Sequence, residues 1–101
     1  MPDDIVVASV ARVERKFGEH EGLAHLKTRT RGKTLTVYSE DEHGELLHVR
    51  FKRVRNSTWT VDFPTHRGTW ERTPFEGTID DLVRQVIEQF GWTLAAQPTA
   101  S

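Results

Sequence analysis

Two histidines near the N-terminus are the first residues whose spacing could support chemistry. The segment HEGLAH places His20, Glu21 and His25 close together. A zinc-protease helix needs His-Glu-x-x-His, because ligands four residues apart lie on the same helical face. Here the histidines are five residues apart, and Gly18 and Gly22 would interrupt a helix. We therefore expect no metal site and no cofactor, and we expect the histidines to be surface residues.

Nucleophilic and acid–base catalysis also lack a motif. The 101 residues contain no cysteine, and no serine lies in a Gly-x-Ser-x-Gly elbow. The paired carboxylates Asp3/Asp4, Asp41/Glu42 and Asp80/Asp81 occur where helix caps and turns favour acids. The glycines are scattered and form no phosphate-binding loop. We predict no catalytic residue, and the sequence favours a protein that is not an enzyme.

A basic, alternating segment is the one feature with binding potential. Residues 48–63 read HVRFKRVRNSTWTVDF. The surrounding residues 27–72 carry ten basic and six acidic side chains, whereas the segments on either side are net acidic. Cations on an open sheet can contact phosphates, and an aromatic ring can stack on a base. The candidate nucleic-acid-binding residues are Arg31, Lys33, Tyr38, His48, Arg50 and Lys52.

Two other interpretations compete with nucleic-acid binding. Outward Arg, Lys and Thr are also typical of a solvated sheet face or of an edge protected against aggregation. The isoelectric point near 6.5 is low for a nucleic-acid binder. An open face or an edge strand could instead associate with a second copy across a two-fold axis. The sequence favours a non-catalytic protein-interaction or adaptor module, a homodimer among its possible forms, with single-stranded nucleic-acid binding as the alternative.

Apolar residues at helical spacing predict one helix near each end of the chain. Val6, Val10, Val13 and Phe17 form a single stripe over residues 4–17, and Gly18 is a suitable end. The second helix is predicted to begin after Thr78 as its N-cap, with Asp81 three residues later. Its apolar face comprises Ile79, Leu82, Val83, Val86, Ile87 and Phe90. We expect Gly91 to end this helix and Trp92 and Leu94 to fold back on the core.

Between these helices the period changes to two, which predicts strands. Three strands cover residues 34–38, 47–52 and 58–63, and residues 69–73 form a weaker one. Residues 23–30 are either a further strand or a loop. In the strand around Val49, the apolar residues Leu47, Val49 and Phe51 face the core, and His48, Arg50 and Lys52 face outward.

The fold class is therefore α+β, with an antiparallel meander of four or five strands. One apolar face on each helix and on the sheet is best satisfied if both helices pack on one side. The other side then presents Thr34, Thr36, Tyr38, His48, Arg50, Lys52, Thr58, Thr60 and Asp62. Residues 1–94 are predicted to be one domain, and residues 95–101 a disordered tail.

The sequence contains no membrane-spanning segment. The longest uninterrupted apolar run is Ile5 to Ala8, whereas a span needs about 20 residues. The N-terminus is acidic where a secretory signal would be basic. Absence of cysteine fits a reducing compartment. We therefore expect a cytoplasmic protein without membrane partners.

The C-terminal half resembles a small bacterial family, the YkuJ-like proteins. The resemblance rests on GELLHVRFKRVRNSTWTVDF and on TPFEGTIDDLVRQVIEQF. It implies a leading helix, a meander with an aromatic-rich strand, and a Pro-Phe-acidic turn before the last helix. The family's members are uncharacterised, so the resemblance assigns no functional residue. The turns here are longer and more basic, and the tryptophan content differs from the family pattern.

Overall fold

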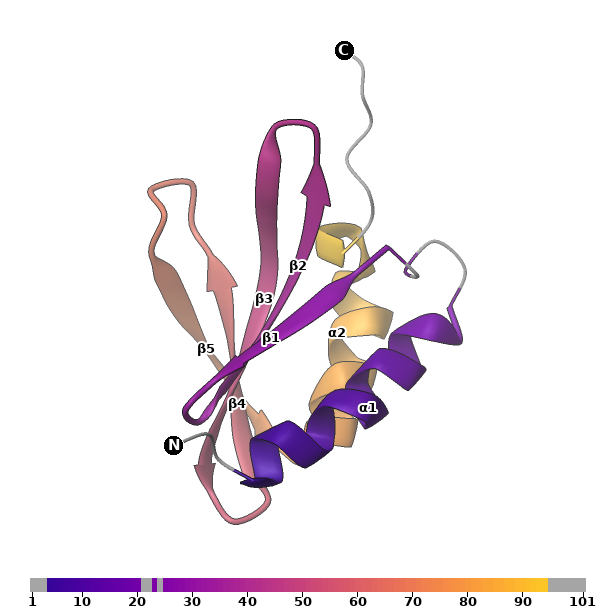
Figure 1. The fold of residues 1–101 in the computed structure, drawn as a ribbon. Coiled ribbons are helices and arrows are strands. Elements are labelled where there is room, and N and C mark those ends of the chain that lie inside the picture. Colours follow the sequence, from indigo (N-terminus) through magenta and orange to yellow (C-terminus); the bar gives the residue numbers. More distant parts are fainter. Residues whose placement is uncertain (1–3, 21–22, 24, 95–101) are drawn as a thin grey trace.

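The chain forms two helices and a five-stranded antiparallel sheet, which confirms the predicted α+β class (Figure 1). The structure, a computed structural model, describes residues 4–20, 23 and 25–94. Helix α1 (Asp4–Gly18) precedes the sheet and α2 (Ile79–Leu94) follows it. The strands lie in the sheet in chain order: β1 (Lys27–Arg31), β2 (Thr34–Asp41), β3 (Gly44–Arg55), β4 (Thr58–Pro64) and β5 (Trp70–Gly77).

Helix α1 is held to the sheet by the predicted apolar stripe. Val6, Val13 and Phe17 are buried. Ser9 is also buried in this stripe, and its hydroxyl donates a hydrogen bond of 2.8 Å to the carbonyl of Ile5. Because this bond satisfies the hydroxyl, a polar residue can lie in the apolar face. The helix ends at Gly18, as predicted.

Helix α2 begins as predicted and ends later than predicted. The amide of Asp81 donates to the hydroxyl of Thr78 at 3.2 Å, which is the expected N-cap contact. The predicted end at Gly91 is wrong, because α2 continues to Leu94. Glycine inside a helix costs only about 1 kcal/mol, so it need not end one. The predicted packing of the Trp92 and Leu94 side chains, and the predicted tail 95–101, lie outside what the structure describes.

The strands confirm the meander and correct two of its boundaries. The segment left open between strand and loop contains β1, which starts at Lys27. Strand β5 continues to Gly77, past the expected end at residue 73. Gly32 and Gly44 lie in the two turns that flank β2, with φ of 56° and 119°. Residues with side chains rarely adopt these angles, so glycine permits both tight turns.

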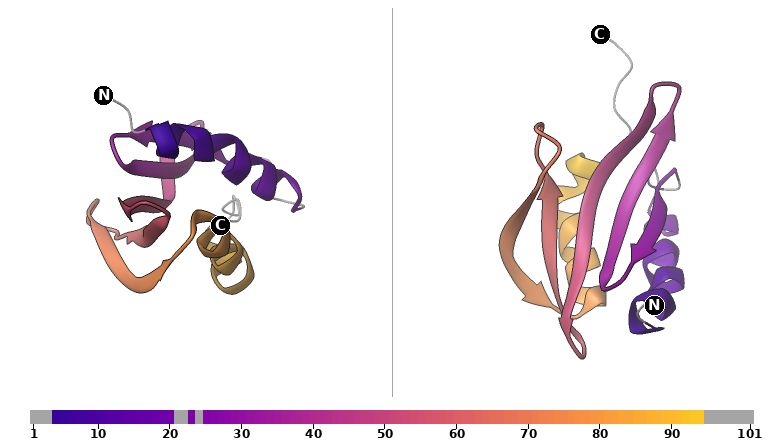
Figure 2. Two further views of the ribbon diagram at one scale, coloured as in Figure 1. Left: turned by 90° about the horizontal axis from the view of Figure 1, so that it is seen from below. Right: turned by 60° about the vertical axis from the view of Figure 1, so that its left-hand side comes forward.

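One hydrophobic core lies between the sheet and both helices, on a single side of the sheet (Figures 1 and 2). The sheet curls around this side, and its other side, here called the outer face, is not covered by either helix. No helix in the described part of the chain is long and apolar enough to cross a membrane. The core comprises Val6, Val13, Phe17, Leu23, Leu35, Val37, Val49, Phe51, Trp59, Val61, Ile79, Leu82, Val83 and Val86.

Candidate interaction surface

Strand register aligns the side chains of the outer face in rows that cross the sheet. Residues directly opposite each other on neighbouring strands share a face. One row runs from Arg31 of β1 through Thr34 and Lys52 to Thr60 of β4. The next runs through Arg29, Thr36, Arg50, Asp62 and Arg72. Four of the six predicted nucleic-acid contacts, Arg31, Tyr38, Arg50 and Lys52, therefore share this face.

Asp62 lies on the outer face and is nevertheless buried. The sequence predicts Asp62 and Thr60 on the solvated side, but only 2% and 4% of their surfaces are exposed. Arg50 donates to Asp62 Oδ2 twice, from Nε at 3.0 Å and from Nη2 at 2.7 Å. Arg72 Nε lies 3.9 Å from Oδ1. The long side chains that register brings from β3 and β5 thus surround this carboxylate.

Arg50 is consequently a structural cation and a poor candidate for contacting an external anion. Its guanidinium carbon lies 4.7 Å from the ring centroid of Trp70, and its side chain is 27% exposed. The guanidinium is therefore shared between an aromatic ring and a buried carboxylate. An approaching phosphate or carboxylate would have to compete with Asp62, which holds Arg50 through two charge-assisted hydrogen bonds.

Tyr38 is similarly engaged by neighbours on the outer face. The Arg29 guanidinium carbon lies 4.5 Å from the Tyr38 ring centroid, and the same guanidinium forms an ion pair with Glu45. The hydrogen bond with Glu45, followed by contact with Tyr38, raises the pKa of Arg29 above its ordinary value. A base stacked on this side of the Tyr38 ring would displace Arg29.

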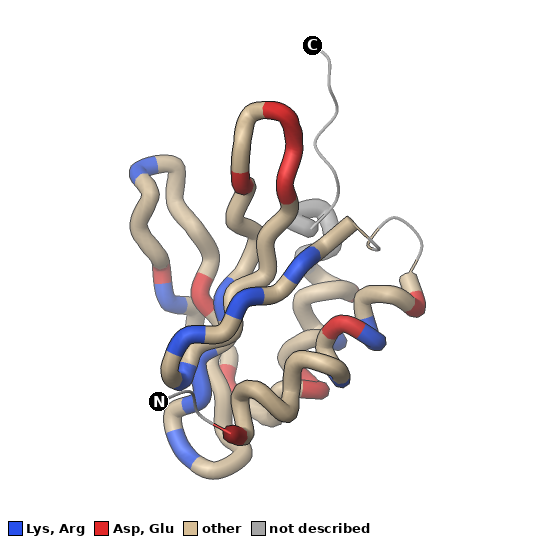
Figure 3. Tube along the Cα trace, viewed as in Figure 1, with Lys and Arg blue, Asp and Glu red and all other residues tan. Residues whose placement is uncertain are grey.

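Four cations at one end of the sheet have no ion-pair partner in the described part of the chain. We call Arg31, Lys33, Lys52 and Arg55 the basic end. The β1–β2 turn lies against the last residues of β3 there, because the Arg53 amide donates to the Lys33 carbonyl at 2.9 Å. This end therefore combines an unneutralised positive charge with exposed or half-buried side chains, and Figure 3 shows Lys and Arg concentrated there.

The opposite end of the β2–β3 hairpin is acidic. We call Glu40, Asp41, Glu42 and Glu45 the acidic tip, and Figure 3 shows acidic residues around this turn. Glu40 pairs with Lys27 at 3.4 Å and Glu45 with Arg29. Asp41 accepts a hydrogen bond from the His43 amide, and the Glu42 carboxylate lies 3.5 Å from the His43 ring. The tip therefore keeps a net negative charge, and the protein has charges of opposite sign at its two ends.

The prediction that His48 faces outward is wrong, because the pairing of β2 with β3 shifts by one residue. Val37 is opposite Val49, but Tyr38 is opposite Leu47, so His48 is an extra residue in a β-bulge. The bulge places Leu47 on the outer face with Tyr38. His48 is only 2% exposed, and its Nε2 lies 2.8 Å from the Ser39 hydroxyl.

His48 has a second histidine beside it. The His25 ring packs edge-on against the His48 ring, with 6.2 Å between centroids. The Nε2 atom of His25 is buried and has no hydrogen-bond partner in the described residues. Within those residues no three His, Cys, Asp or Glu side chains converge in a way that could hold a metal ion. We therefore interpret His25 and His48 as a pair of polar side chains packed at the edge of the core.

We expect Ser39→Ala to lower the free energy of unfolding by about 1 kcal/mol, because it removes the hydrogen bond to a buried imidazole. Urea denaturation followed by circular dichroism measures this change. Ser57→Ala, in the exposed β3–β4 turn, is the control and should leave the stability unchanged. Equal stability of the Ser39→Ala and wild-type proteins would contradict a structural role for the Ser39–His48 contact.

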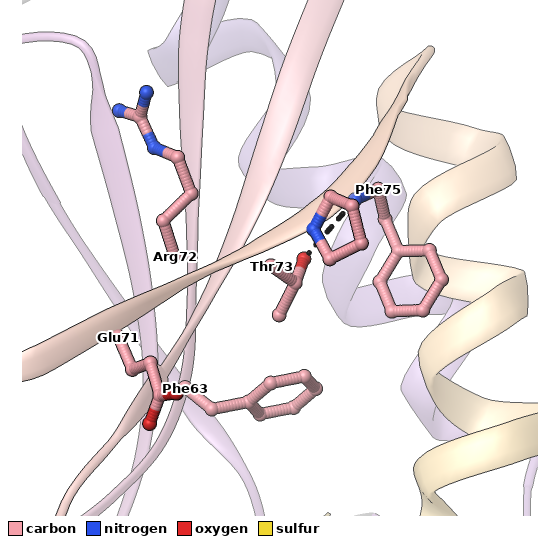
Figure 4. A pocket seen from close by; sticks show the side chains of 6 residues that line it. Phe63, Glu71, Arg72, Thr73 and Phe75 are labelled. Atoms are coloured by element: carbon pink, nitrogen blue, oxygen red, sulfur yellow. Dashed lines mark hydrogen bonds between the residues drawn. The ribbon is translucent and has the colours of Figure 1, made fainter.

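One hollow on the surface of the described residues is largely apolar and lies at β5. A pocket of about 340 Å³ is lined by residues of β4 and β5. In Figure 4 the rings of Phe63 and Phe75 lie toward α2, whereas the Arg72 side chain extends away from them. The hydroxyl of Thr73 is occupied, since it donates to the Val61 carbonyl at 2.9 Å. The pocket presents no convergent polar groups that would orient a substrate.

Comparison of the chain with family models, with curated proteins and with solved structures finds no match. The resemblance to the YkuJ-like proteins accordingly stays an expectation from the sequence. Among the residues predicted to bind nucleic acid, the structure brings Arg31, Lys33 and Lys52 together at the basic end. Arg55 belongs with them and was not among the predicted residues. Its basic side chain, three residues after Lys52 in the sequence, was the available signal, and the structure places it at the exposed end of β3.

Proposed function

We propose that this chain is a non-catalytic interaction module that binds an acidic segment of a protein at its basic end. The supporting observation is the set of four cations at the β1–β2 turn and the adjoining end of β3, with no ion-pair partner in the described residues. Elsewhere on the outer face the cations Lys27, Arg29 and Arg50 already have carboxylate partners. Unneutralised charge attracts an oppositely charged partner and speeds its association.

Single-stranded nucleic acid is the second candidate, since its phosphates would use the same four cations. Tyr38 and Trp70, which could stack bases on this face, are each in contact with a guanidinium. A base would have to compete with that contact, whereas an acidic peptide needs only the charges. The acidic peptide is therefore the better fit to the geometry.

We expect poly-L-glutamate to bind the protein at low salt, and Lys33→Glu with Lys52→Glu to weaken this binding at least tenfold. Raising the salt from about 50 mM to about 200 mM should also weaken binding, because counterions compete for the cations. Tryptophan fluorescence or calorimetric titration measures both effects, at protein concentrations too low for self-association.

Arg15→Glu with Arg67→Glu is the matched control, because it changes charge by the same amount at exposed positions of α1 and the β4–β5 turn. This control should bind like the wild type. Equal weakening in both variants would mean that net charge, and not the basic end, determines binding. Tighter binding of oligodeoxythymidylate than of poly-L-glutamate would favour the nucleic-acid candidate, and absence of binding to both would overturn the proposal.

A further inference from the structure

The two ends of the β2–β3 hairpin complement each other in charge. The acidic tip and the basic end lie at opposite ends of β3, whose 12 residues correspond to roughly 36 Å of extended strand. A molecule cannot bring its own tip to its own basic end along a straight strand. Two molecules placed antiparallel can make that contact twice.

Exposed large apolar residues occur near both ends of β3 and also on α1. Leu46 and Val54 are 38% and 37% exposed, and Ile5 and Val7 of α1 are each 46% exposed. Leu46 is opposite Ser39 and points to the helix side of the sheet, whereas Glu45 is opposite Glu40 on the outer face. The complementarity of the two ends is therefore one of charge and not of apolar surface.

The edges of the sheet are unsuited to pairing with a second copy. Lys27, Arg29 and Arg31 of β1 all lie on the outer face, so antiparallel β1–β1 pairing about Arg29 would place cations opposite cations. Strand β5 contains Pro74, and its pairing with β4 shifts between Thr60 and Asp62. Proline and irregular pairing protect a sheet edge from further strands.

We propose that the acidic partner of the basic end is the acidic tip of a second copy of this chain. The result is a two-fold dimer in which each tip contacts the other molecule's basic end. The two-fold axis is perpendicular to β3, so the β3 strands of the two copies run antiparallel. The two contacts between a tip and a basic end are then equivalent and form together. This inference rests on the proposed function, because it names the occupant of the same surface.

Charge reversal at one end, then at the other, tests this arrangement. Glu40→Lys with Asp41→Lys and Glu42→Lys changes the net charge of the tip from −4 to +2, and Lys33→Glu with Lys52→Glu and Arg55→Glu changes that of the basic end from +4 to −2. In sedimentation velocity at low salt, we expect the wild type to convert from monomer to dimer as its concentration rises. Each reversed variant alone should stay monomeric, because both of its contacts become repulsive.

Mixing the two reversed variants should restore dimers, since both contacts in the mixed pair are then attractive. The variant with Arg15→Glu and Arg67→Glu should dimerise like the wild type. The proposal is overturned if the wild type stays monomeric throughout, if the reversed variants still self-associate, or if their mixture stays monomeric. Growth into open polymers would also overturn the closed two-fold arrangement.

The two proposals can fail separately. A wild type that binds poly-L-glutamate at the basic end and never dimerises rejects the second copy as partner and retains the acidic-segment module. If the mixed variants form dimers and the wild type does not bind poly-L-glutamate, the two-fold dimer is retained and a general site for acidic segments is rejected. If the protein neither binds poly-L-glutamate nor dimerises, both proposals are rejected.

Discussion

Arg50→Ala is expected to lower the free energy of unfolding by about 3 kcal/mol. The substitution leaves Asp62 97% buried by side-chain area, since only 3% is exposed, and removes the two hydrogen bonds that Oδ2 accepts. Breaking a buried ion pair by removing one partner typically costs about 3–5 kcal/mol. Arg72 is 3.9 Å from Oδ1 and compensates in part, so the lower end of that range applies. Urea denaturation at neutral pH measures the change.

Lys52→Ala provides a matched control for this prediction. Lys52 lies two residues further along β3 on the same face and has no ion pair in the described residues, so its loss should change stability by less than about 0.5 kcal/mol. Replacing both partners, as Arg50→Met with Asp62→Leu, should recover most of the lost stability, because no buried charge is then left alone. An Arg50→Ala protein as stable as the control would contradict the structural role of this pair.

This pair also determines which variants can report on binding. A variant lacking Arg50 would lose affinity for any partner merely by loosening β3 and β4. Lys33 and Lys52 carry charge without stabilising the fold through ion pairs in the described residues. Binding experiments on the outer face should therefore use these two residues and leave Arg50 intact.

The helices and the strand order could be predicted from the sequence because each depends on local periodicity. The stripe of Val6, Val13 and Phe17 needs only helical spacing to share one face. The alternation around Leu35 and around Val61 likewise needs only the two-residue period of a strand. The short turns then leave a meander as the simplest connection.

The bulge at His48 could not be predicted because it depends on how β2 pairs with β3. A regular alternation through Leu47, Val49 and Phe51 places His48 outward, and one extra residue reverses the side on which every earlier residue lies. The burial of Asp62 has a comparable cause. Asp62 is buried because the register of β3 and β5 with β4 places Arg50 and Arg72 beside it.

The sequence shows that the candidate surface is rich in cations, but it does not show which of these cations are already neutralised. The excess of cations between residues 27 and 72 is visible in the sequence. Which cations are already neutralised depends on contacts such as Lys27 with Glu40, which are 13 positions apart in the chain and become neighbours only through hairpin pairing. The structure therefore reduces a broad basic segment to four residues at one end of the sheet.

Trp59→Ala is expected to have the largest effect on stability, about 4 kcal/mol. Trp59 is 1% exposed and lies in the core between the sheet and the helices. Removing the indole leaves a cavity that neighbouring side chains, fixed on strands and helices, can fill only in part. Small domains have about 5–15 kcal/mol of stability in total, so this variant should unfold at much lower urea concentration.

Trp70→Ala is the informative comparison, because it removes the same side chain from the other face of the sheet. Trp70 is half-buried and contacts the Arg50 guanidinium, so its loss should cost about 1 kcal/mol through the cation–π contact. Both helices cover the side that holds Trp59 and neither covers the side that holds Trp70, and the unequal costs follow from this difference. Equal destabilisation by the two substitutions, measured by urea denaturation, would mean that protein covers both faces and that the outer face is not available to a partner.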